Sequence, residues 1–212
     1  MPKKQAGLRE RILDKALEQA EASSWERLHL HAVAGALQIG LDEILCHFPR
    51  KDDLVEAWFD RADRAMLGAD RGPDFPGLPL QERLHQVICS WLDALAPHRR
   101  LTREMLAYKL EPGHVHLQAL GIMRISRTVQ WFREAAHQDS TGLQRIVEES
   151  ALSSIYLAAF ARWLFDDAGN GSKGKAFLEK ALHHWLGSGH ATPGKQSAAP
   201  KRTAAAPQQP GH

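Results

Sequence analysis

Apolar residues recur every three or four positions along most of this chain, with charged and polar residues between them. The first such run covers residues 6–22, and its apolar positions are Leu8, Ile12, Leu13, Ala16, Leu17 and Ala20. A period near 3.6 places these side chains on one face, so the run predicts an amphipathic helix. Alternating apolar and polar runs longer than four residues do not occur, and no strand is predicted.

Eight further segments repeat this pattern, and breakers such as Pro49, Pro97 and the Gly/Pro-rich residues 71–79 separate them. They cover residues 29–37, 41–47, 52–66, 80–96, 101–110, 116–137, 143–166 and 176–186. Residues 188–212 are dominated by Pro, Ala, Gly, Lys, Gln and Ser and are predicted to be a disordered tail. The expected fold class is therefore all-α.

The composition of the chain excludes some classes of protein but does not indicate a function. The chain has 212 residues and is 43% apolar, enough to build a sizeable core. Its net charge is +2, but the tail holds Lys195, Lys201 and Arg202, and without them 24 basic residues face 25 acidic ones. The strong basic excess of many nucleic-acid-binding proteins is missing. Cys46 and Cys89 form no disulfide framework, and no signal peptide or membrane-spanning run is present, so a cytoplasmic protein is expected.

Residues 33–48 indicate two short helices joined by a tight turn. Ala34 is small where the helices approach, Leu37, Ile39 and Ile44 can close a small core, and Gly40 supplies the turn. The segment Phe-Pro-Arg-Lys-Asp-Asp-Leu follows at 48–54, and Arg-Ile-Leu-Asp-Lys-Ala-Leu precedes at 11–17. Together these segments resemble the helix-turn-helix of the TetR family of transcriptional regulators, over about residues 7–66.

The resemblance implies a homodimer whose third helix enters the major groove of a DNA operator. Lys51 would contact a phosphate, and Lys3 and Lys4 would reach another from a flexible arm. The DNA-binding positions are then Lys3, Lys4, His29, Gly40, Leu41, Asp42, Glu43, Leu45, Cys46, His47 and Lys51.

The resemblance also implies a division of the chain into residues 1–52, the DNA-binding module, and 53–187, a helical ligand-binding and dimerisation domain. Helical domains hold apolar ligands between their helices. The candidate residues for a small apolar or lipid-like ligand are Trp91, Met105, Tyr108, Met123, Trp131 and Phe160. Small residues between 150 and 163 are expected to let the last two long helices form a dimeric four-helix bundle.

Several DNA-facing positions depart from the family pattern. Asp42 and Glu43 replace small or hydroxyl residues, Leu45 replaces a tyrosine, Gln38 a glycine and His29 a threonine. Residues 1–64 carry ten basic and twelve acidic residues, which gives little counterion release on DNA. These departures keep a second hypothesis open.

That alternative is a lipid- or isoprenoid-binding accessory protein of ubiquinone biosynthesis, which has the TetR fold but does not bind DNA. Residues 63–66, 82–84, 92–99, 152–156, 163–166 and 177–178 resemble that family. Its glycine–aspartate and tyrosine–lysine–arginine hallmarks are missing, and Lys51 is more typical of TetR regulators.

Other chemistry is weakly indicated. Residues 169–175, Gly-Asn-Gly-Ser-Lys-Gly-Lys, resemble a phosphate-binding loop, but Ala176 replaces the Ser or Thr and a helix precedes it, so an interhelical loop is predicted. The histidine pairs 29/31, 114/116 and 183/184 lack the i, i+4 spacing of metal ligands. With no catalytic constellation, cofactor or metal site predicted, the sequence favours a ligand-responsive TetR-type repressor that is not an enzyme.

Overall fold

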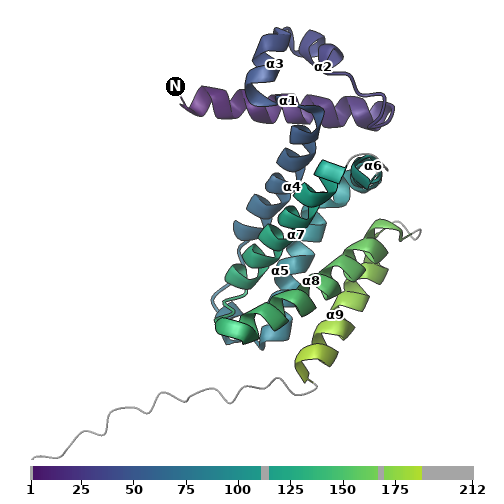
Figure 1. The fold of residues 1–212 in the computed structure, drawn as a ribbon. Helices are drawn as coiled ribbons and strands as arrows, with labels where there is room; N and C mark the ends of the chain where they lie inside the picture. Colours follow the sequence, from purple (N-terminus) through teal and green to yellow (C-terminus); the bar gives the residue numbers. More distant parts are fainter. Residues whose placement is uncertain (1, 111–114, 167–169, 188–212) are drawn as a thin grey trace, which may run out of the picture.

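Helices follow one another along the whole of the structure, a computed structural model that describes residues 2–110, 115–166 and 170–187 (Figure 1). They are α1 (Pro2–Ala22), α2 (Leu30–Leu37), α3 (Leu41–His47), α4 (Lys51–Leu67), α5 (Leu80–Leu95), α6 (Arg99–Leu110), α7 (Val115–Ala135), α8 (Gly142–Leu164) and α9 (Ser172–Gly187), with short 3₁₀ turns at Phe75–Gly77 and Ala96–His98. The predicted all-α fold is confirmed. The predicted disordered tail lies outside the described residues.

Several helix boundaries differ from the predicted ones, and three of these differences change how a segment is interpreted. α1 begins at Pro2, because proline suits the first position of a helix, so residues 3 and 4 belong to its first turn rather than to a preceding arm. α9 begins at Ser172, so residues 172–175 are helical rather than loop. Pro97 lies in a 3₁₀ turn that runs directly into α6, which bends the chain without a separate loop.

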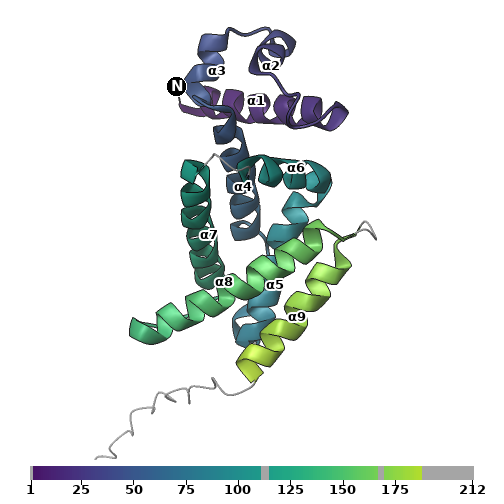
Figure 2. The ribbon, with the colours of Figure 1, turned by 45° about the vertical axis from the view of Figure 1, so that its right-hand side comes forward.

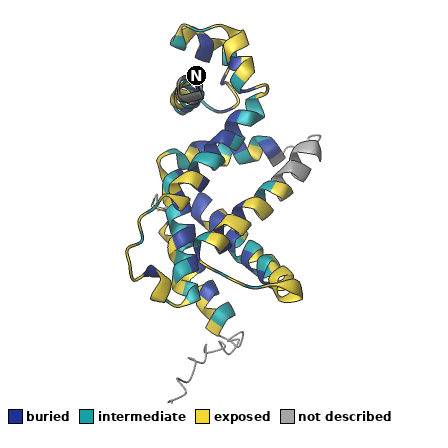
Figure 3. Cartoon of the chain, turned by 90° about the vertical axis from the view of Figure 1, so that its left-hand side faces the viewer, coloured by how far each residue is buried: buried dark blue, intermediate teal, exposed yellow. Residues whose placement is uncertain are grey.

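α1, α2 and α3 form a module at one end of the molecule, and α4 runs from it into the larger helical body (Figures 1 and 2). The buried side chains that hold this module together come from all three helices and from the start of α4. They are Ile12, Leu13, Leu17, Val33, Ala34, Ile44, Phe48 and Leu54. Figure 3 shows buried residues concentrated where helices meet and exposed residues along the outer surfaces.

Trp91 of α5 lies at the centre of the larger body and is 1% exposed. Its ring stacks on Phe59 of α4 at 5.9 Å and meets Phe132 of α7 edge-on at 6.0 Å. Tyr156 and Phe160 of α8 lie 5.5 and 5.3 Å from it, also edge-on. Such aromatic pairs contribute beyond their buried area, so this cluster fixes four helices relative to one another.

α8 and α9 approach closely at Gly174. A Cβ at this position would lie 2.6 Å from the backbone nitrogen of Trp163, so a glycine is required for the two backbones to meet. Within the described residues, no helix is long and apolar enough to cross a membrane.

Candidate DNA interface and ligand cavity

The outer face of α3 is the exposed surface of the helix-turn-helix. Ile44 is 1% exposed and anchors α3 in the module core, which turns the opposite side of the helix to solvent. Leu41 and Leu45 are 54% and 60% exposed there. Asp42, Glu43 and Cys46 are also exposed, and His47 is half-buried. The structure thus brings the predicted base-facing residues together on one short helix.

The two acids of α3 lie in its first turn. Glu43 accepts a hydrogen bond from the backbone N–H of Gly40 at 3.2 Å, which caps the helix. Negative charge at a helix N-terminus is also favourable to the helix dipole. Asp42 and Glu43 therefore have a local structural reason to be acidic, independent of any partner.

The turn between α2 and α3 is made by Gln38, whose φ is +55°. The backbone N–H of Gln38 donates a hydrogen bond to the Gly35 carbonyl at 3.2 Å, and the Ile39 N–H donates one to the Ala34 carbonyl at 3.1 Å. Glycine adopts this left-handed conformation without strain, whereas a side chain raises its energy. At the other end of α2, His29 makes no side-chain capping bond and instead stacks on His31 at 5.3 Å.

Lys51, a predicted phosphate contact, is engaged within the protein. Its ammonium donates to the Trp25 carbonyl at 2.6 Å and the Glu26 carbonyl at 3.2 Å. It also lies over the rings of Trp25 and Tyr108, at 5.1 and 5.7 Å. Burial lowers the pKa of Lys51. In this conformation Lys51 joins α4 to the turn after α1 and to α6, and its contact with DNA stays a prediction.

The acidic balance of residues 1–64 changes once the ion pairs are known. Three of the twelve carboxylates lie on α4 and pair with cations of α6 and α7. The pairs are Glu56 with Lys109 and Arg124, Asp60 with Arg124 and Arg127, and Asp63 with Arg124. Glu21 likewise pairs with Arg100 of α6, and without these four carboxylates ten basic residues face eight acidic ones in this segment. The module itself is therefore close to neutral.

α6 holds the far end of α1 and the turn that follows it. Glu104 accepts a hydrogen bond from the Trp25 N–H at 2.8 Å, although 79 residues separate them. Arg100 binds both the backbone carbonyl and the carboxylate of Glu21, at 2.8 and 2.9 Å. His98 lies 3.1 Å from the other carboxylate oxygen of Glu21. The orientation of the helix-turn-helix is thus tied to α6 (Figure 2).

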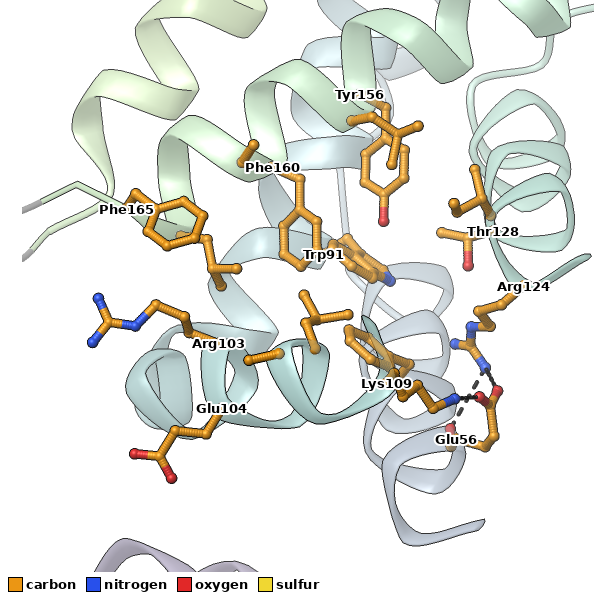
Figure 4. Close-up of a pocket in the computed structure, with 17 residues that line it drawn as sticks. Glu56, Trp91, Arg103, Glu104, Lys109, Arg124, Thr128, Tyr156, Phe160 and Phe165 are labelled. Atoms are coloured by element: carbon orange, nitrogen blue, oxygen red, sulfur yellow. Dashed lines mark hydrogen bonds and ion pairs between the residues drawn. The ribbon is translucent and has the colours of Figure 1, made fainter. Parts of the chain in front are cut away.

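A cavity of about 850 Å³ lies between α4, α5, α6, α7 and α8, a size suited to a drug-sized ligand (Figure 4). Most of its walls are apolar, and α6 forms one of them. The lining residues are Glu56, Phe59, Trp91, Arg103, Glu104, Leu106, Ala107, Lys109, Arg124, Ile125, Thr128, Tyr156, Leu157, Phe160, Ala161, Leu164 and Phe165.

The predicted ligand residues divide into two groups. Trp91 and Phe160 line the cavity. Met105 and Tyr108 lie on α6 but are not among the lining residues, and Met105 is fully buried in the core. Met123 and Trp131 are 61% and 43% exposed on α7, also away from the lining. The inward stripe of α7 instead runs through Ile125, Thr128, Val129 and Phe132.

Charged residues at one end of this cavity had no place in the sequence prediction. Glu56 of α4 pairs with both Lys109 of α6 and Arg124 of α7 (Figure 4). Behind them, buried Asp63 accepts hydrogen bonds from the Trp91 indole at 2.8 Å and from Arg124 at 2.8 Å. Burial raises the pKa of Asp63, and Arg124 opposes that shift. One sequence signal was available, because Asp63 occupies an apolar-face position between Phe59 and Met66.

Within the described part of the chain, no group of three or more His, Cys, Asp or Glu side chains could hold a metal ion. His183 and His184 are exposed on α9, and His114 lies outside the described residues.

Solved structures of known proteins share this architecture. The crystal structure of the TetR transcriptional regulator from Nitrosomonas europaea ATCC 19718 matches with a TM-score of 0.74 and 43% sequence identity, over 85% of this chain and 99% of that one. A TetR transcriptional regulator from Rhodococcus sp. RHA1 shares the fold, with a TM-score of 0.64 and 19% identity over 88% of this chain and 98% of that one. No protein-family model and no curated protein matches.

The chain belongs to the TetR family of transcriptional regulators. The comparisons lend no support to the alternative, a lipid-binding accessory protein of ubiquinone biosynthesis.

Proposed function

We propose that this regulator is a homodimeric repressor that binds operator DNA through α3 and changes its DNA affinity when an apolar ligand enters the cavity. The observation that carries the DNA proposal is the outward face of α3, where Leu41 and Leu45 are more than half exposed while Ile44 is buried. The two leucines exposed on this helix can make apolar contacts with thymine methyl groups of the major groove. Residues 1–52 would be the DNA-binding module and 53–187 the ligand-binding and dimerisation domain, with α4 shared between them.

Two arginines flanking the helix-turn-helix would contact phosphates in addition to the predicted contact of Lys51. Arg50 precedes α4 directly after α3, and Arg27 lies in the turn before α2; both are exposed. Arg50 pairs with Asp53 of the same turn at 3.0 Å, an exposed contact that DNA can replace. With few such cations, we expect a shallow dependence of DNA affinity on salt.

The proposed dimer uses the outer stripe of α8. Apolar and small side chains recur along it at helical spacing and are exposed or half-exposed. The stripe consists of Leu143, Val147, Ser150 and Ser154. Small residues allow close helix approach, and a two-fold dimer presents both α3 helices to one duplex.

The ligand response would act through α6. One side of this helix lines the cavity, while Arg100 and Glu104 hold the end of α1. A ligand that favours one position of α6 therefore favours one orientation of the helix-turn-helix, and only such differential affinity can shift DNA binding.

Fluorescence anisotropy with labelled DNA from upstream of the protein's own gene tests the proposal. Leu45→Glu adds a negative charge at the centre of the reading face and should weaken binding by at least tenfold. The matched control is Leu67→Glu, at the far end of α4 and 41% exposed, which should bind as the wild type does. Equal affinities for all three proteins, with unchanged melting temperatures, would remove α3 from the interface.

A further inference from the structure

The polar end of the cavity has an uneven arrangement of charge. Lys109 and Arg124 line the cavity, and their side chains are only 9% and 10% exposed. Three carboxylates pair with these cations: Glu56, Asp60 and Asp63. Of the three, Glu56 alone lines the cavity. Two buried cations therefore face this space with one carboxylate beside them.

A hydroxyl group at the same end is available as a hydrogen-bond donor. Tyr156 lines the cavity and is 4% exposed, and none of the hydrogen bonds found within the described residues involves its hydroxyl. Figure 4 shows the Tyr156 ring beside Trp91 with the hydroxyl at its inner tip. A hydroxyl in the wall of an otherwise apolar cavity favours a ligand that supplies a hydrogen-bond acceptor.

The remaining walls suit an apolar body. Trp91, Phe160 and Phe165 line the space away from the charged end, together with the aliphatic side chains of α6 and α8 (Figure 4). The second charged region, formed by Arg103 and Glu104, contributes one charge of each sign. The lining therefore has more cations than carboxylates at the Lys109–Arg124 end, and equal numbers at the Arg103–Glu104 end.

We infer that the cavity binds an amphipathic organic anion, a carboxylate on an apolar body, with its head group between Lys109, Arg124 and Tyr156. This inference rests on the proposed ligand response and specifies the ligand class. A carboxylate there accepts from the Tyr156 hydroxyl and competes with Glu56 for both cations. Glu56 belongs to α4, the helix that continues into the DNA-binding module. Binding of the head group would therefore affect the link between the cavity and this module through α4, as it would through α6.

Three probes with one apolar body and different heads test the inference: dodecanoate, dodecan-1-ol and dodecyltrimethylammonium. We expect calorimetric titration, below the micellar concentrations, to give a Kd for dodecanoate at least tenfold lower than for dodecan-1-ol, since hydrogen bonds to a charged group are worth about one such factor. Dodecyltrimethylammonium should bind more weakly than either. Equal affinity for acid and alcohol, preference for the cation, or no binding of dodecanoate would overturn the inference.

Variants locate the head group. Tyr156→Phe removes a single hydroxyl and should reduce the preference for acid over alcohol about threefold or more. Lys109→Met removes one of the two cations that face the head group, while Glu56 keeps its pair with Arg124, and this variant should reduce the preference further. Arg103→Gln is the control and should leave the preference unchanged. Loss of the preference in Arg103→Gln but not in Tyr156→Phe would place the head group elsewhere.

DNA anisotropy on the same preparations separates this inference from the proposed function. A protein that binds its operator but shows no preference for dodecanoate contradicts only the ligand class. A protein that prefers dodecanoate but binds no DNA contradicts the proposed function and leaves the cavity chemistry standing.

Discussion

Removing the Glu104 carboxylate should release the end of α1 from α6. Glu104→Ala deletes the acceptor of the Trp25 N–H, a partly buried bond of 2.8 Å between the cavity wall and the helix-turn-helix. Hydrogen bonds to a charged group contribute about 1.5–3 kcal/mol, and every 1.4 kcal/mol changes an equilibrium tenfold. The Trp25 amide should therefore exchange with solvent roughly 10- to 100-fold faster in the variant. At about 2–4 °C per kcal/mol, the melting temperature should fall by several degrees.

Amide hydrogen exchange followed by NMR measures this directly at one residue. Glu104→Gln keeps an acceptor oxygen and should retain much of the protection, which separates the hydrogen bond from the charge. Arg103→Ala, one position earlier on α6 and exposed, should leave Trp25 unchanged. Unaltered exchange of the Trp25 amide in Glu104→Ala would show that α6 does not hold the module in solution, and the proposed route from cavity to DNA would lose its first step.

Three further predictions concern the turn, the α8–α9 contact and the reading helix. Gln38→Gly should raise the free energy of unfolding by up to about 1 kcal/mol in chemical denaturation, because φ at this position is +55°. Gly174→Ala should lower it by about 1–3 kcal/mol, since the new methyl group overlaps the Trp163 backbone. With iodoacetamide at pH 8, exposed Cys46 should react fast and Cys89 slowly, because burial raises the pKa of Cys89 to about 11; operator DNA should protect Cys46 alone.

Each of these has an internal comparison. Gln38→Ala keeps a Cβ in the left-handed conformation and should gain little, so an equal gain in both variants would remove the backbone explanation. Gly187→Ala, at an open position of α9, should be close to neutral; a similar loss there would make the α8–α9 overlap irrelevant. Equal labelling of Cys46 with and without bound DNA would place the duplex away from α3.

Local pattern was enough to predict the helices. Residues 41–47 were predicted and observed as a helix, and the spacing of apolar positions also located residues 80–95 and 142–164 within one residue or two. Boundaries moved where backbone chemistry, not periodicity, decides them. Gly174 is an example, because a glycine that reads as a loop residue serves here as the point where two helices touch.

Site residues were harder to predict, because the sequence alone does not show which apolar stripe of a helix faces inward. Met123 and Trp131 carry large apolar side chains but face solvent, whereas Thr128 and Arg124 line the cavity. Lys51 occupies the position predicted to contact a phosphate, but in the structure its ammonium donates hydrogen bonds to the Trp25 and Glu26 carbonyls. Pairing of charges across α4, α6 and α7 depends on tertiary contacts between residues more than 50 positions apart.

The central claim is that the exposed face of α3 recognises specific DNA. The most direct measurement is sequencing of the genomic fragments that the purified protein retains at about 150 mM salt, with Leu45→Glu processed in parallel. The account predicts that the wild-type protein enriches a small set of fragments sharing a two-fold symmetric site, and that Leu45→Glu loses them. Retention of no fragment by the wild-type protein, or of the same fragments by both proteins, would contradict it.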